Sequence, residues 1–268
     1  MSLLLNESFL INNFISISNK IKNISFFFIY FNCIESFKNL DKNREIIPLT
    51  TSNNIISKIK YKLIKLNQSN ITPYNFNNNF PKSLYHVFIA SYLLEQNSLC
   101  FIIYNNPFIL SSNLPILNDF SYSFNFKKIN YSNLKSYFSP YFLSNPFIPI
   151  DIFVISFLIN NNISKLDQQT LNIIIDQYRL GREKIEIYSI LSILQYLNNY
   201  STLQIIKYLL QFKYTWSNYC LCFYFILNYS NLLKEHLLYD EFNKYIQSHP
   251  KERNKNIINT INNILFII

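Results

Sequence analysis

The chain has 268 residues, of which 49 % are hydrophobic, 18 % aromatic and only 15 % charged, and its formal net charge is +9. This composition excludes an intrinsically disordered chain and predicts a folded protein with a sizeable core. The single glycine, Gly181, excludes phosphate-binding loops, dinucleotide-binding turns and glycine-flanked nucleophile elbows, because each needs several positions that favour glycine.

Residues 1–160 are predicted to form one of two domains, a mixed α/β module. Residues 3–21 fit an opening helix, and residues 81–96 fit a helix with proline in its first turn and apolar residues on one side. Residues 24–33 and 99–104 are short apolar runs bounded by asparagine. Such runs suit buried strands, although periodicity alone does not separate them from buried helix.

Residues 120–126 alternate aromatic and polar side chains and predict a half-buried strand, with Ser123 and Asn125 on its polar face. Lys127 and Lys128 follow, so the aromatic stripe resembles a platform on which nucleic-acid bases stack. In a chain with 25 phenylalanines and 21 tyrosines, an aromatic face is more often part of the core. We therefore favour the core interpretation.

Residues 164–268 are predicted to form an all-helical domain. Ser164 is a candidate N-cap for a helix over residues 165–179, with Asp167 in its first turn. Gly181 follows this helix where a left-handed C-cap residue is expected. The fold class is thus mainly α, with a helical array or bundle in the C-terminal half and the mixed α/β module before it.

The strongest local helix signal is the sequence Ser201-x-x-Gln204, a capping box that predicts a helix over residues 202–213. Further helices are expected at residues 183–198, 216–229, 231–247 and 253–266. The spacing of the helix starts, about 15 to 18 residues, is typical of stacked antiparallel hairpins.

The long apolar runs predict buried core segments and no transmembrane span. Residues 214–233 lack charge but contain several asparagines, and the run at residues 148–159 is too short and contains Asp151. The first residues lack the basic region and cleavage site of a signal peptide. We expect an intracellular protein that is not secreted.

The only set of side chains with metal-binding chemistry is Cys220, Cys222, His236 and His249. Zinc sites normally pair cysteines two to four residues apart and histidines three to five apart, and neither spacing occurs here. Buried core cysteines are the better interpretation. We predict no catalytic, cofactor-binding or metal-binding residue.

Two groups of basic residues are candidate nucleic-acid contacts. Lys58, Lys60 and Lys62 alternate with apolar residues, so a strand would present three ammonium groups on one face, about 7 Å apart. The alternative is a lysine-decorated edge strand or a helix surface. Arg179 and Arg182 flank the single glycine and could hold a phosphate or a carboxylate, or belong to a solvated turn.

The favoured function is a non-catalytic interaction or structural subunit of a larger assembly, with other protein subunits as its partners. It rests on the missing glycine motifs, the helical pattern and the aromatic excess, which suits protein interfaces. The excess of Asn, Lys, Ile, Phe and Tyr, whose codons are rich in A and T, indicates an AT-rich genome such as that of an organelle. The alternative is an RNA- or ribosome-associated basic protein, supported by the net charge of +9.

Overall fold

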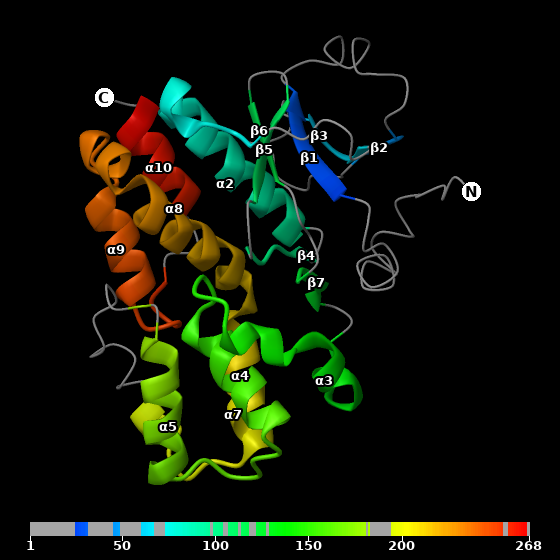
Figure 1. Cartoon of the computed structure of the whole chain (residues 1–268), viewed down its shortest axis with the longest axis vertical. Coiled ribbons are helices and arrows are strands. Elements are labelled where there is room, and N and C mark those ends of the chain that lie inside the picture. The colour runs from blue at the N-terminus through cyan, green and yellow to red at the C-terminus, as the bar shows by residue number, and fades with distance from the viewer. Residues whose placement is uncertain are drawn as a thin grey trace. The chain divides into compact units, whose positions relative to one another are not determined.

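The computed structural model of this chain describes residues 25–31, 45–48, 60–66, 73–96, 99–103, 107–111, 114–117, 122–126, 129–180, 182, 194–253 and 257–266. The described part is mainly α-helical, which confirms this level of the predicted fold class (Figure 1). The chain divides into two compact units, Met1–Lys127 together with Ile258–Ile268, and Lys128–Ile257. We describe each unit by itself.

The first unit contains antiparallel strand pairs. Five strands join in the order β2-β3-β1-β6-β5, and β4 pairs with β7. Their bounds are β1 Ser25–Phe31, β2 Glu45–Pro48, β3 Lys60–Leu66, β4 Leu99–Cys100, β5 Phe108–Ser111, β6 Leu114–Leu117 and β7 Phe124–Asn125. Because β3 pairs with β2 on one side and β1 on the other, the edge-strand interpretation of its lysines is wrong.

Helix α2 (Phe80–Gln96) confirms the predicted helix over residues 81–96 and packs on β6 and β4. Leu84, Val87, Phe88 and Leu94 are fully buried as expected, but residues 86–91 are all buried, so burial of α2 is not limited to the predicted apolar side. The short helix η3 (Phe76–Asn78) precedes α2, and α10 (Ile257–Phe266) completes the unit. The helix predicted over residues 3–21 lies outside the described residues.

The half-buried strand predicted over residues 120–126 is wrong for the part that the structure describes. Only β7 is a strand there, and both Ser123 and Asn125, expected on a solvated face, are buried. The Ser123 hydroxyl accepts a hydrogen bond from the backbone N–H of Ile102 at 3.2 Å. A polar residue can be buried when it satisfies a backbone group in this way, so its polarity alone did not predict exposure.

The second unit is helical among its described residues, and α4 lies at its centre. Residues 150–159 of α4 are all buried, which confirms the buried segment expected from the apolar run. Helix α4 packs against α5, α7 and η6, and α8 packs against α9 (Figure 1). The bounds are η5 Tyr131–Asn133, α3 Leu134–Tyr137, η6 Pro140–Leu143, α4 Ile150–Asn160, α5 Gln168–Arg179, α7 Thr202–Leu209, η7 Leu210–Thr215, α8 Trp216–Glu235 and α9 Tyr239–Gln247.

The start of α5 differs from the predicted one. Its N-cap is Asp167, whose carboxylate accepts a hydrogen bond from the Thr170 N–H at 2.8 Å. The Ser164 carbonyl instead accepts a hydrogen bond from the N–H of Thr202 at 2.9 Å, so Ser164 connects the loop before α5 to the start of α7. The cap expected at Gly181 lies outside the described residues.

The later helices differ in their bounds. The Ser201–Gln204 capping box is present, but α7 ends at Leu209 and continues as the 3-10 helix η7. The break predicted near residue 230 is confirmed, because the backbone of α8 leaves helical geometry at Tyr229 (φ −136°, ψ 31°), where two helical segments meet. A second turn, which was not predicted, lies at Leu237, whose φ is 58°.

The predicted domain boundary at residues 160 to 164 falls inside the second unit, since α4 packs against helices on both sides of it in sequence. Most of the predicted helix 183–198 lies outside the described residues, although Leu194 and Leu197 at its end are buried. Compact units in a structure do not by themselves show that each predicted domain folds independently. The division into two domains therefore stays a prediction.

Candidate functional site

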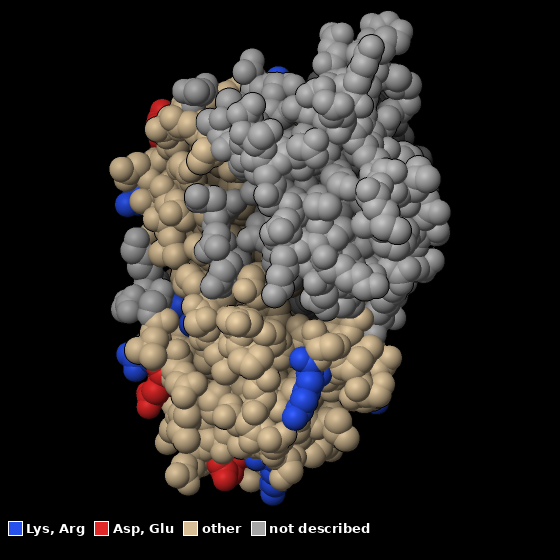
Figure 2. Space-filling model, turned by 45° about the vertical axis from the view of Figure 1, so that its right-hand side comes forward, with Lys and Arg blue, Asp and Glu red and all other residues tan. Residues whose placement is uncertain are grey.

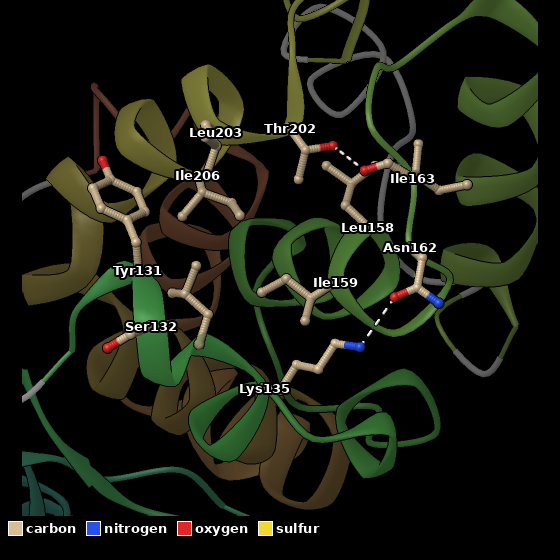
Figure 3. A pocket seen from close by; sticks show the side chains of 11 residues that line it. Tyr131, Ser132, Lys135, Leu158, Ile159, Asn162, Ile163, Thr202, Leu203 and Ile206 are labelled. Atoms are coloured by element: carbon tan, nitrogen blue, oxygen red, sulfur yellow. Dashed lines mark hydrogen bonds between the residues drawn. The ribbon is translucent and has the colours of Figure 1, made fainter.

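The second unit has a surface pocket of about 510 Å³ between η5, α3, the end of α4 and α7 (Figure 3). Its floor is apolar and buried, with Leu158, Ile159 and Ile206 from α4 and α7. Its rim is also apolar but stands in solvent, since Tyr131 is 56 % exposed and Leu203 is 60 % exposed. The pocket thus combines a packed floor with large exposed side chains.

Local capping interactions hold the two sides of the pocket. On one side, the Asn130 side chain caps η5 and fixes the turn that carries Tyr131. On the other side, the Ser201 hydroxyl accepts a hydrogen bond from the N–H of Gln204, which fixes the first turn of α7. The hydroxyl of Thr202 donates to the carbonyl of Ile163 and ties α7 to the loop after α4 (Figure 3).

The polar groups at the pocket form hydrogen bonds within the protein and leave one positive charge. Lys135 extends along one wall, and its Nζ donates to Oδ1 of Asn162 at 3.0 Å (Figure 3). Asn162 adopts φ 53°, a left-handed conformation that asparagine tolerates well. The Asn162 Oδ1 and the Ile163 carbonyl are already occupied by hydrogen bonds within the protein. The ammonium group of Lys135 remains as the charge at this site.

A second polar cluster lies inside the same unit and joins α4 to the segment after α9. Arg253 donates from Nη1 to Oδ2 of Asp151 at 2.8 Å, and both side chains are at most 1 % exposed. Arg253 also lies 4.8 Å above the ring of Tyr219 and 3.4 Å from the Thr215 hydroxyl. Burial is the largest single influence and disfavours the charged guanidinium, but the Asp151 carboxylate together with Tyr219 and Tyr245 raises the pKa of Arg253.

Two buried tyrosines extend this cluster. The Tyr178 hydroxyl donates to the Ile148 carbonyl at 3.2 Å and lies 3.1 Å from the Tyr219 hydroxyl, which therefore donates to Tyr178. Burial raises the pKa of Tyr178 and raises that of Tyr219 well above its usual value. Both phenols stay protonated at neutral pH and act as hydrogen-bond donors that connect α5 to α8.

The predicted nucleic-acid contacts belong to both units. Lys58 lies outside the described residues, whereas Lys60 and Lys62 are two positions apart on the inner strand β3. Arg179 is exposed in the last turn of α5. No observation tests whether any of these residues touches nucleic acid, so that contact stays a prediction.

Arg182 is buried rather than presented to solvent. Its guanidinium donates to the carbonyls of Asn145, Pro146 and Tyr178 and lies 4.2 Å from the centre of the Tyr178 ring. A phosphate could reach this guanidinium only if these hydrogen bonds were broken. In this arrangement Arg182 connects α5 to the loop before α4.

Cysteines and histidines do not gather into a site in the described part of the chain. Cys100, Cys220 and Cys222 are buried, as expected for core residues. Among the described residues, no group of three or more His, Cys, Asp or Glu side chains is placed to hold a metal ion. None of the described helices is long and apolar enough to cross a membrane.

Sequence reasoning missed both the pocket and the buried ion pair. Asp151 and Arg253 are 102 residues apart, and the only signal was a carboxylate inside an apolar run. No protein-family model matches this chain, and no similar protein is found among the curated sequences or the solved structures. The function must therefore be argued from the site itself.

Proposed function

We propose that this protein is a non-catalytic interaction subunit that binds another protein through the pocket of its second unit. One observation carries the proposal, namely the buried apolar floor beneath a rim where Tyr131 and Leu203 keep more than half of their surface exposed. Clustered exposed apolar side chains around a pocket favour burial by a partner, and tyrosine is enriched at such interfaces.

The charge distribution of the described surface supports the same proposal. Figure 2 shows one face on which isolated charged side chains of both signs are scattered over a mainly uncharged surface. A protein that follows a nucleic-acid backbone needs a continuous positive groove to neutralise several phosphates. The described residues of this face favour a protein partner over RNA.

The experiment is a selection of displayed random 16-residue peptides on the full-length protein, followed by affinity measurement. We expect Leu203→Asp to weaken the selected peptides at least about tenfold, because it places a charge in the apolar rim. The matched control is Leu237→Asp, which changes another largely exposed leucine, 73 % exposed against 60 % for Leu203, in the turn after α8. Peptides that bind both variants like the parent protein would refute the proposal.

The detailed architecture of the two units and the location of the protein are also part of this proposal. We propose that the strands and α2 of the first unit form the mixed α/β module, and that the helices of the second unit form part of a helical array. An intracellular location, in a compartment served by an AT-rich genome, fits a subunit of a larger assembly. The Leu203 experiment does not depend on any of these three features.

A further inference from the structure

We infer that the pocket accepts an amphipathic helix of the partner, in which an acidic side chain stands next to two apolar anchor residues. This inference rests on the proposed function, because it specifies the partner that the same pocket binds. It is carried by the open shape of the pocket and by Lys135, the single cation among the described residues that line it.

The shape favours a helix over a small enclosed ligand. At about 510 Å³ the pocket lies within the range of roughly 300 to 1,000 Å³ that is typical of ligand sites. Small molecules are usually buried over most of their surface, whereas here Tyr131 from η5 and Leu203 from α7 are exposed to solvent at the rim (Figure 3). An open pocket with an apolar floor fits one face of a helix, which inserts anchors three or four residues apart.

The charge at the pocket favours an acid. The one hydrogen-bond partner of Lys135 among the described residues is the neutral side chain of Asn162, and no described carboxylate forms an ion pair with it. The pocket acceptors, Oδ1 of Asn162 and the carbonyl of Ile163, are already used. A carboxylate at the rim would pair with the ammonium group, whereas a basic side chain would be repelled.

The test is a charge exchange between the protein and a selected peptide. Peptides selected on the parent protein are expected to carry an Asp or Glu next to apolar residues spaced three or four apart. Lys135→Glu should weaken such a peptide at least about tenfold, and changing the acid of the peptide to Lys should restore affinity for that variant. Lys244→Glu, which reverses an exposed charge on α9, a helix that contributes no residue to the pocket lining, is the matched control and should change affinity less than about twofold.

Other results separate this inference from the proposed function. Peptides that lose affinity with Leu203→Asp but bind Lys135→Glu like the parent protein would overturn the acidic partner and leave the interaction surface intact. Peptides insensitive to Leu203→Asp would overturn both. A fatty acid would also bring a carboxylate and an apolar chain to the pocket, so laurate is tested as a probe. Laurate that binds one to one and displaces the peptide would overturn the helix as the occupant. Thermal melts of each variant confirm that the protein is folded.

Discussion

The buried ion pair between Asp151 and Arg253 gives the sharpest prediction about stability. Asp151→Asn removes one charge and leaves the Arg253 guanidinium, 3 % exposed, without a counter-ion. Breaking a buried pair in this way typically costs about 3 to 5 kcal/mol. Because Asn keeps one oxygen that accepts a hydrogen bond, we expect a loss near the lower end, about 3 kcal/mol.

Replacing both partners should destabilise the protein much less than removing one of them. The pair is joined by one hydrogen bond, and Oδ1 of Asp151 and Nε of Arg253 have no hydrogen-bond partner among the described residues. Two buried polar atoms without partners reduce what the pair contributes. The double variant with Asp151→Leu and Arg253→Met should therefore be far less destabilised than Asp151→Asn, as for other buried pairs replaced by apolar residues.

Urea unfolding followed by tryptophan fluorescence measures these effects in the unit concerned. Trp216 is the only tryptophan, is fully buried at the start of α8, and packs edge-on against Phe138 at 6.2 Å. The matched control is Asp176→Asn, an exposed carboxylate on α5 that should change stability by less than about 0.5 kcal/mol. A loss below about 1 kcal/mol for Asp151→Asn, or a double variant less stable than that single one, would refute the reasoning.

Two further predictions concern single side chains. Burial, followed by the charge of Lys82, lowers the pKa of His86 to about 3. The folded state thus prefers the neutral imidazole, and the free energy of unfolding should fall by about 2 kcal/mol from pH 8 to pH 5, because His86 becomes protonated in the unfolded chain. Urea unfolding of His86→Gln at both pH values should lack this loss. A loss as large in the variant as in the parent protein would contradict the prediction. Ser201→Ala should cost about 1 kcal/mol by removing the cap of α7, whereas Ser164→Ala, at the cap position that the structure does not use, should not; equal thermal shifts would contradict this.

Features set by neighbours in sequence were predictable, and features set by tertiary packing were not. The Ser201–Gln204 capping box and the burial of Leu84, Val87, Phe88 and Leu94 in α2 follow from spacings of three and four residues, and both are present. The break near residue 230 is also present, as the kink at Tyr229, whereas the turn at Leu237 was not predicted. Leucine rarely adopts a positive φ, and the fully buried Leu233 and Leu238 on either side show that packing favours this turn.

The same limit explains why the candidate site was not found from the sequence. Its floor comes from α4 and α7, and its rim from turns about 70 residues apart, so no local pattern contains it. Each contributing segment carried a readable signal, such as the apolar run of α4 or the cap of α7. Their meeting depends on how these helices pack, which the sequence pattern does not specify.

Helix α4 connects the stability of the unit to its binding surface. Its first turn carries Asp151, held by Arg253, and its last turns supply Leu158 and Ile159 to the pocket floor. The floor is therefore part of a fully packed helix, while Leu203 and Lys135 at the rim are exposed and contribute little to packing. A rigid floor with an exposed rim suits a binding site, because the partner orders few side chains when it docks. Variants of the rim should therefore change the affinity for the partner without changing the free energy of unfolding. Variants of the ion pair should lower the free energy of unfolding and leave the affinity unchanged as long as the unit is folded.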